Sequence, residues 1–252
     1  MRECIAIANQ KGGVGKSTTT SALGAGLLQK GYKVLFVDLD AQGNLSYSMG
    51  ITGKALSSLE VLTGTATAQE AIVHTEQGDL IPASPALATT DNLLTELGKE
   101  YRLKEALEPV LEEYDYILLD TPPALGVLAA NALTASTGVI IPAQADAYSL
   151  QGIGQLAQTI QAVKKYSNKD IVIKGLLVTR YNARSILTRD MTELLEATAS
   201  QLNTKLYDTK IRECVAIKES QASQQDIFSY APKSNASKDY TAFLEEVLKE
   251  RK

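Results

Sequence analysis

The 252-residue sequence predicts an α/β fold in which one doubly wound, mostly parallel sheet is covered by helices on both faces. Two observations lead to this prediction: short apolar runs rich in β-branched residues, and longer amphipathic segments that alternate with them. No repeat, linker or low-complexity tract interrupts the alternation, so we expect a single domain over residues 1–252. The runs expected to form strands are residues 5–8, 34–37, 79–82, 116–119, 138–141, 171–179 and 205–207.

The segments between these runs predict helices, because their apolar residues return every three or four positions. Two capping boxes, Ser57 with Glu60 and Thr67 with Glu70, mark further helix starts. The last helix is expected to pack against the body, since a membrane-surface helix would carry a more basic polar face. The helices expected from periodicity are residues 18–30, 103–113, 125–135, 152–166, 186–202 and 237–251.

The composition excludes several classes of protein. With 44% hydrophobic and 21% charged residues, the sequence is typical of an ordinary globular domain. It holds no secretory signal and no apolar run of the roughly 18 residues that a membrane span needs, so we expect a cytoplasmic protein. The two cysteines, Cys4 and Cys214, have neither zinc-site nor disulfide-framework spacing, and we expect them to be buried or partly buried. The single histidine, His74, is expected on the surface in a polar connection.

The charges are unevenly distributed along the chain. Residues 1–159 hold 9 Lys and Arg against 17 Asp and Glu, a net charge of −8, whereas residues 160–252 hold 16 against 12, a net charge of +4. The overall charge of −4 opposes binding of a polyanion by the chain as a whole. A polyanionic partner would therefore have to bind a local patch in the C-terminal third.

The segment NQKGGVGKSTTT at residues 9–20 lies between the first expected strand and the first helix. Its glycines allow a tight turn that presents backbone amides to phosphate oxygens, and the helix N-terminus adds partial positive charge. In such a P-loop, Lys16 would neutralise the β and γ phosphates, Ser17 would offer its hydroxyl to Mg²⁺, and Thr18 would donate to the α phosphate. The candidate cofactor-binding residues are Lys11, Gly12, Gly13, Val14, Gly15, Lys16, Ser17 and Thr18.

Three aspartates follow strands that are expected to be parallel. Asp38 and Asp40 follow the second strand with alternate spacing, and Asp120 ends the apolar run at residues 116–119. The carboxyl ends of parallel strands meet at one edge of the sheet, so all three carboxylates are expected near the P-loop. Asp120 would hold Mg²⁺ through a bound water, because this ion prefers oxygen ligands and keeps much of its hydration.

The string KGGVGKST at residues 11–18 resembles the deviant Walker A motif of the ParA/MinD family of ATPases, with Gln10 where the common P-loop has its first glycine. The strings DLDAQGN at 38–44 and LLDTPP at 118–123 also resemble that family's motifs, except that Ala41 stands where the family often has proline. The resemblance implies an ATPase in which Lys11 reaches the partner's phosphates within an ATP-bound dimer and Asp40 orients or deprotonates the attacking water. Lys11, Lys16 and Asp40 are thus the catalytic candidates, and Ser17, Asp38 and Asp120 the metal-site candidates.

The sequence resembles the DNA partition branch of this family most, because Asn9-Gln10 precedes Lys11, Gln42-Gly43-Asn44 follows Asp40, and Ala183-Arg184 follows a late strand. This implies an ATP-dependent sandwich homodimer that binds nonspecific double-stranded DNA on the nucleoid and is stimulated by a ParB-type centromere-binding protein. Arg184 and Arg212 are the DNA-binding candidates. Residues 211–216 read IRECVA where many relatives read IPRNVR, so the second family arginine is missing; Arg189, Lys210 and Lys218 are nearby charges that could compensate.

Other functions remain open at the level of sequence. A positioning ATPase of the MinD type would act at a membrane or on another cargo. The basic tail at residues 249–252 is short and flanked by acidic residues, which does not favour a membrane anchor. An electron-transfer iron protein on the same fold would need paired cysteines, which this chain lacks. A transcriptional regulator that uses ATP only as a switch is a further alternative.

Overall fold

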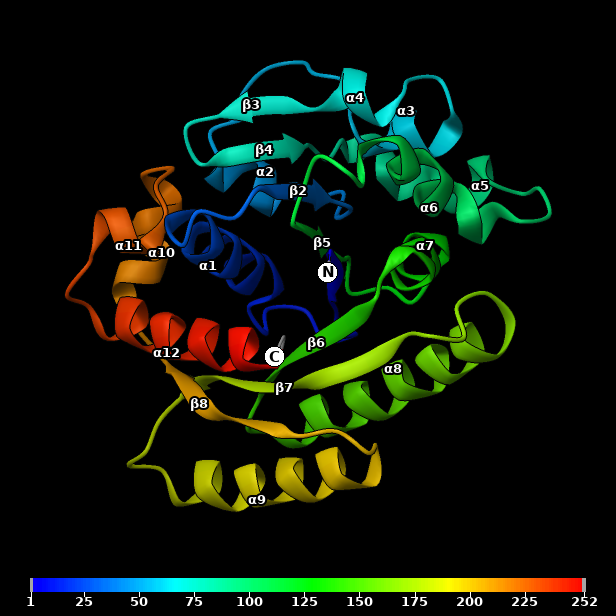
Figure 1. The fold of residues 1–252 in the computed structure, drawn as a ribbon. Coiled ribbons are helices and arrows are strands. Elements are labelled where there is room, and N and C mark those ends of the chain that lie inside the picture. The colour runs from blue at the N-terminus through cyan, green and yellow to red at the C-terminus, as the bar shows by residue number, and fades with distance from the viewer. Residues whose placement is uncertain (1, 251–252) are drawn as a thin grey trace.

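The computed structural model describes residues 2–250, in which eight strands form one sheet in the order β3-β4-β2-β5-β1-β6-β7-β8 (Figure 1). All neighbouring strands are parallel except β3 and β4, which form an antiparallel pair at one edge. The strands are β1 Glu3–Ile7, β2 Val34–Asp38, β3 Val73–Thr75, β4 Gly78–Ile81, β5 Tyr116–Asp120, β6 Gly138–Gln144, β7 Val172–Tyr181 and β8 Leu206–Arg212.

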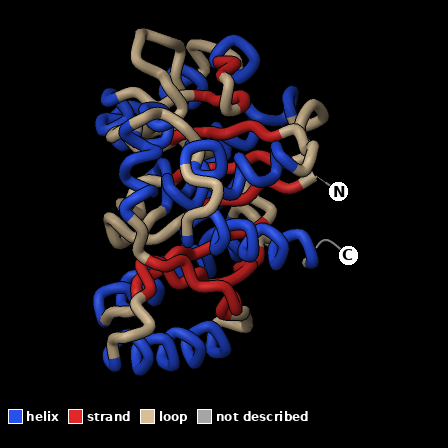
Figure 2. The backbone as a smooth tube through the Cα atoms, turned by 90° about the vertical axis from the view of Figure 1, so that its left-hand side faces the viewer, coloured by secondary structure: helices blue, strands red, loops and turns tan. Residues whose placement is uncertain are grey.

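Helices cover both faces of the sheet, and the strands run through the middle of the molecule (Figures 1 and 2). One face packs against α1, α2, α11 and α12, and the other against α3, α4 and α6 to α9. The helices are α1 Lys16–Gln29, α2 Asn44–Ser48, α3 Ser58–Thr63, α4 Ala68–Ala71, α5 Thr90–Leu93, α6 Arg102–Leu107, α7 Val127–Ala135, α8 Ala147–Tyr166, α9 Ile186–Gln201, α10 Val215–Ala222, α11 Ile227–Tyr230 and α12 Asn235–Lys249. The predicted fold class is confirmed.

The two cores follow from the side-chain alternation of the strands. In β1, Ile5 and Ile7 belong to the core beneath α1 and α12, whereas Cys4 and Ala6 belong to the opposite core. The approach of α1 to the sheet is close: a Cβ atom on Gly24 would lie only 2.1 Å from ring carbons of Phe36 in β2. This packing fixes the start of α1, and with it the P-loop, against the carboxyl ends of β1 and β5.

Most expected elements are present, with boundaries that differ by a few residues. Both predicted capping boxes form, at α3 and α4. The apolar face of α12 is buried through Tyr240, Phe243, Leu244 and Val247, which confirms its packing against the body. The expected end of this helix at residue 251 lies outside the described residues. Cys4 is buried and Cys214 is half-buried, and both are free thiols, as expected.

Two expectations are wrong. His74 lies within the short strand β3 rather than in a connection, because its backbone pairs with β4 across a tight turn that ends at Gly78; its side chain is exposed, as expected, and contacts Asp79. The helix expected over residues 103–113 ends as α6 at Leu107 and continues only as a 3₁₀ turn, Glu108–Val110. Pro109 explains this end, since it lacks the amide hydrogen that an α-helix needs there.

Within residues 2–250 no helix is both long enough and apolar enough to cross a bilayer.

Candidate active site

The P-loop connects β1 to α1 and presents free backbone amides at the carboxyl edge of the sheet. Gly13 and Gly15 have φ angles of 74° and 89°, in the left-handed region that glycine adopts without strain. Gly15 is the N-cap of α1 and supplies no side chain to satisfy the first amides of the helix. A Cβ atom on Gly12 or Gly13 would meet no atom within 4 Å, so the loop borders open space. The loop is thus shaped to receive an anion.

A cavity of about 480 Å³ lies over this loop. Its walls bring together seven of the predicted site residues, namely Gly12, Gly13, Gly15, Lys16, Ser17, Thr18 and Asp40. They also include residues to which sequence reasoning assigned no role in the site, among them Gln42, Asn44, Tyr47, Arg180 and Gln221. Arg180 has a φ angle of 50°, an unusual backbone conformation that is not encoded in any local motif. We call this space the phosphate cavity.

Lys16 is held beside the phosphate cavity with only 7% of its surface exposed. Its ammonium donates a long hydrogen bond of 3.4 Å to the carbonyl oxygen of Lys11. Burial lowers the pKa of Lys16, and the nearby Asp120 and Asp40 carboxylates oppose that shift. An anion in the cavity would supply the close counter-charge that this lysine lacks.

Asp120 is a buried carboxylate that no well-formed hydrogen bond satisfies. It is completely buried at the end of β5, and among residues 2–250 neither of its side-chain oxygens accepts a hydrogen bond. Burial raises the pKa of Asp120 well above its usual value, as does neighbouring Asp38, whereas Ser17 and Lys16 oppose the shift. A buried carboxylate of this kind calls for a cation or a bound water. Asp120 and the Ser17 hydroxyl therefore fit the outer and inner ligands of a hydrated Mg²⁺ ion.

Asp38 lies next to Asp120, because the register of β2 and β5 pairs these two residues. It is fully buried, and its oxygens accept hydrogen bonds from the Ser46 amide at 2.9 Å, the Ser46 hydroxyl at 2.7 Å and the Asp40 amide at 3.1 Å. Burial, the largest cause, raises the pKa of Asp38 to about 6 despite these bonds. Asp38 thus holds α2 and the loop after β2 in place and sets the position of Asp40.

Asp40 is half-buried on the wall of the phosphate cavity. One of its oxygens accepts a hydrogen bond of 3.1 Å from the Gln42 amide, which orients the carboxylate. Its charge acts on Lys16, so the two groups share one electrostatic environment. A carboxylate in this position can accept a proton from, or orient, a water molecule in the cavity.

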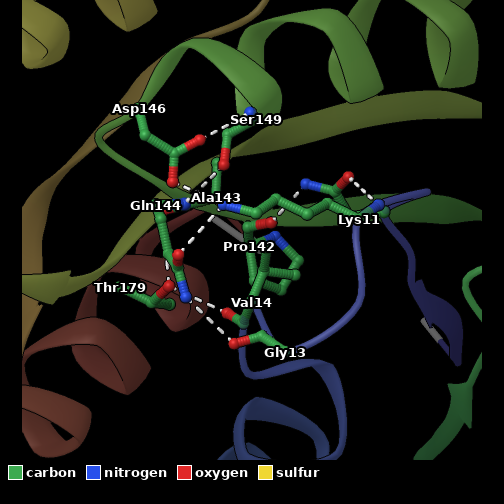
Figure 3. A network of polar contacts seen from close by, with 10 residues as sticks. Lys11, Gly13, Val14, Pro142, Ala143, Gln144, Asp146, Ser149 and Thr179 are labelled. Carbon is green, nitrogen blue, oxygen red and sulfur yellow. Dashed lines mark hydrogen bonds and ion pairs between the residues drawn. The ribbon is translucent and has the colours of Figure 1, made fainter.

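Lys11 does not line the phosphate cavity but bonds to the connection between β6 and α8 (Figure 3). Its ammonium donates a hydrogen bond of 3.0 Å to Gln144 and forms an ion pair with Asp146. The Gln144 amide in turn donates to the carbonyl oxygen of Gly13 at 3.0 Å, and Asp146 caps α8 at Ser149. The backbone amide of Lys11 donates to Asn9, whose side chain is anchored on Pro142. Gln144 and Asp146 are site residues that sequence reasoning missed, since 133 and 135 positions separate them from Lys11.

A second cavity, of about 180 Å³, adjoins the phosphate cavity through shared residues Gly15, Thr18, Arg180 and Gln221. One wall of it is apolar, formed by Val14, Ile211, Ile217 and Tyr240 together with Cys214. Charged side chains complete the lining, among them those of Arg180, Arg212, Glu213 and Lys218. Residues 211–214, the first part of the segment that departs from the pattern of the family it resembles, therefore lie beside the P-loop. An apolar wall next to a phosphate site is suited to the base of a nucleotide.

The two DNA-binding candidates have different surroundings. Arg184 is exposed in the turn between β7 and α9. Arg212 ends β8 and binds Asp239 of α12 through three nitrogens: the backbone amide at 3.0 Å, Nε at 2.9 Å and Nη2 at 2.6 Å. The carboxylate of Asp239 thus offsets the charge of Arg212, whereas that of Arg184 faces solvent. Of the possible compensating charges, Arg189 and Lys218 are exposed, and Lys210 lies 5.9 Å from the ring centre of Tyr181.

A comparison with protein-family models matches residues 2–173 to an AAA domain. Among curated proteins, the sporulation initiation inhibitor protein Soj of Bacillus subtilis is 40% identical over 252 residues, which cover 98% of each chain. The chromosome partitioning protein ParA of Caulobacter vibrioides is 36% identical over 251 residues, which cover 97% of this chain and 93% of that protein. The likeness therefore extends over nearly the whole chain.

Among solved structures, the chain is similar to cobyrinic acid a,c-diamide synthase from Mycobacterium smegmatis with bound ADP and magnesium. The TM-score is 0.85 at 35% sequence identity, and the match covers 98% of this chain and 94% of that one. The same protein has also been solved with a bound ATP analogue and magnesium. Together with the phosphate cavity and the unpaired Asp120, these similarities identify ATP and Mg²⁺ as the ligands of the site.

Proposed function

The chain belongs to the ParA/Soj family of P-loop ATPases, and on this premise we propose that it hydrolyses ATP to ADP and phosphate in a DNA partition system. ATP binding drives a sandwich dimer, the dimer binds double-stranded DNA without sequence preference, and a ParB-type centromere-binding protein stimulates hydrolysis and release. The observation that supports this proposal most directly is the position of Lys11. This lysine lies at the start of the P-loop, but its ammonium is held in an ion pair with Asp146 and does not line the phosphate cavity of the same chain.

Each residue of the site has a proposed role. The P-loop amides and Lys16 bind the β and γ phosphates, and Thr18 binds the α phosphate. Ser17 and Asp120, with Asp38 behind them, would hold Mg²⁺, which supplies charge neutralisation to the phosphates. Asp40 orients the attacking water and accepts its proton. Lys11, once released from Asp146, would stabilise transition-state charge on the partner's nucleotide, as an arginine finger does.

The proposed DNA surface centres on Arg184, whose charge is exposed beside α9. Contacts of such a side chain with phosphates carry no sequence information and weaken with salt, because DNA binding releases counterions. Since Asp239 already offsets the charge of Arg212, we assign Arg212 a smaller share of DNA affinity. The remaining positive charge of the C-terminal third would add nonspecific attraction.

A second candidate function is the synthesis of cobyrinic acid a,c-diamide, because the similar Mycobacterium smegmatis structure is that of a cobyrinic acid a,c-diamide synthase. Release of ammonia from an amide donor by a thiol nucleophile would require a cysteine beside a base. Among residues 2–250, His74 contacts Asp79, Cys4 is buried in β1, and Cys214 lies at the start of α10. This arrangement offers no cysteine–histidine pair and favours the partition ATPase.

The proposed function is tested by DNA binding measured without nucleotide, with Mg-ADP and with Mg-ATP over a salt series. Fluorescence anisotropy with two duplexes of unrelated sequence should show binding with Mg-ATP alone, equal for both sequences and weaker at higher salt. The variant Lys16→Ala is the matched control and should not bind under any of these conditions. Binding that ignores nucleotide, or none with Mg-ATP, would contradict the proposal.

A further inference from the structure

Thr18 and Gln221 meet at the boundary between the phosphate cavity and the second cavity. Thr18 lies in the first turn of α1 and Gln221 near the end of α10, 203 positions later. The Gln221 side-chain amide donates a hydrogen bond of 3.0 Å to the Thr18 hydroxyl. Both side chains are half-buried, and both line the two cavities. The pair therefore forms part of the wall that a bound nucleotide would contact between its phosphates and its base.

The direction of this hydrogen bond decides what Thr18 can do. A hydroxyl group has one proton to donate and two lone pairs that accept. Because Gln221 occupies a lone pair, the Thr18 proton stays available, and among residues 2–250 no acceptor takes it. A hydroxyl that accepts a hydrogen bond also becomes a better donor, since the bonds polarise one another. The amide of Gln221 thus prepares Thr18 to donate into the phosphate cavity.

Neighbouring contacts hold Gln221 in place before any ligand binds. Ser220, the preceding residue, is buried, and its carbonyl oxygen accepts the amide of Gln225 at 3.0 Å. The Gln77 side chain donates to the carbonyl oxygens of both Ser48 and Gln224 at 2.9 Å, which ties the segment after α10 to α2. These bonds fix the end of α10 to the body, so Gln221 is preorganised toward the P-loop.

We propose that Gln221 is a positioning residue for the nucleotide: it acts through Thr18, orienting the hydroxyl toward the phosphate chain and coupling α10 to occupancy of the P-loop. The inference rests on the proposed function in that the cavity must bind a nucleotide. It assigns a role to a residue for which no motif in the sequence predicts one. Gln221 contributes through the proton of Thr18, so its effect disappears when Thr18 has no hydroxyl.

Two substitutions separate this role from simple packing. Gln221→Met keeps the length of the side chain but removes its donor, so the Thr18 hydroxyl loses its fixed orientation. Gln221→Glu reverses the hydrogen bond, because a carboxylate only accepts. The Thr18 hydroxyl would then donate to the carboxylate instead of to the phosphates, and a negative charge would lie beside the phosphates. The expected order of affinity is wild type, then Gln221→Met, then Gln221→Glu.

The test is a double-mutant cycle read out as the dissociation constant of Mg-ADP by titration calorimetry. Gln221→Met should weaken binding about fivefold, the effect of one neutral hydrogen bond, and Gln221→Glu by more than that. In a Thr18→Val background, Gln221→Met should cause no further loss. Gln158→Met, at an exposed position of α8, is the matched control and should bind as the wild type does.

The possible failures are distinguishable. Wild-type binding together with unchanged affinity of both Gln221 variants would overturn the role of Gln221 alone. An equal fivefold loss in the Thr18→Val background would overturn it as well, because the residue would then act through the packing of α10. Absence of Mg-ADP binding by the wild type would overturn the proposed function, and this role with it.

Discussion

Lys11 and Asp146 form an ion pair within one chain, across the gap between the P-loop and the connection that follows β6 (Figure 3). The family resemblance predicts that Lys11 acts on the nucleotide of a second protomer. The ion pair and the expected contact with the second protomer are compatible only if the ion pair breaks when the dimer forms. The free energy of the ion pair therefore opposes dimerisation.

Asp146→Asn should favour the ATP-bound dimer. The asparagine retains an oxygen that can cap α8, so the helix start is preserved while the charge that holds Lys11 is removed. Because the pair is partly exposed, we expect a modest gain, about two- to fivefold in the dimer dissociation constant. Sedimentation velocity with Mg-ATP measures it, with Asp190→Asn at an exposed position of α9 as the control. A weaker or unchanged dimer would show that the ion pair does not restrain Lys11.

Asp40→Ala and Lys16→Ala should separate hydrolysis from binding. Loss of the Asp40 carboxylate removes the group that orients water, so turnover should fall by about 10²- to 10⁴-fold while Mg-ATP still binds. Loss of Lys16 removes the main counter-charge for the phosphates, so binding itself should fail. Phosphate release and nucleotide titration on both variants check this, and equal turnover in Asp40→Ala and the wild type would exclude Asp40 as the base.

Asp120→Asn should raise the thermal stability of the nucleotide-free protein at neutral pH. The reason is that no well-formed hydrogen bond satisfies the two buried oxygens of Asp120, so its charged form costs free energy that a neutral amide reduces. The same change should remove most of the stabilisation that Mg-ADP gives over ADP alone, because a ligand of the metal is lost. Scanning calorimetry with ADP, with and without EDTA, measures both effects. A lower stability without nucleotide would mean that Asp120 has a partner in solution.

Arg184→Ala and Arg212→Ala should affect different properties. Arg184 is exposed, so its loss should weaken DNA binding with Mg-ATP and lower the slope of log affinity against log salt by about 1. Arg212 ties β8 to α12 through Asp239, so its loss should mainly lower the melting temperature. Anisotropy over a salt series and thermal melts on both variants make the comparison. Equal salt slopes for Arg184→Ala and the wild type would show that Arg184 does not contact DNA phosphates and that the DNA-binding surface lies elsewhere.

Gly24→Ala should destabilise the fold by about 1–3 kcal/mol, because the added methyl group would overpack α1 against Phe36. Gly154→Ala is a matched control in the exposed part of α8, where a Cβ atom meets nothing within 4 Å. There the same change should stabilise by about 0.4–1 kcal/mol, since it restricts the unfolded chain. Urea unfolding of both variants checks the opposite signs. Two effects of the same sign would contradict the described packing.

Local patterns were sufficient for the strands and helices that carry the site. The strands predicted over residues 34–37 and 116–119 are present and extend one residue further, to Asp38 and Asp120. Gly13 and Gly15 of the P-loop have left-handed φ angles, which the tight turn expected there requires. The helix expected over residues 103–113 was wrong past Leu107 because Pro109 overrides apolar periodicity. The strand at His74 was missed because three residues at a sheet edge carry almost no periodic signal.

The sequence by itself determined the fold class, the phosphate-binding loop and the three aspartates, since each depends on residues a few positions apart. Only the tertiary structure decided which side chains hold these groups: Asp146 binds Lys11, Gln221 binds Thr18 and Asp239 binds Arg212. Those partners lie 135, 203 and 27 positions apart. They meet because the strand order places β6 beside β1, because the end of α10 contacts the first turn of α1, and because α12 packs against β8. No local pattern encodes this arrangement.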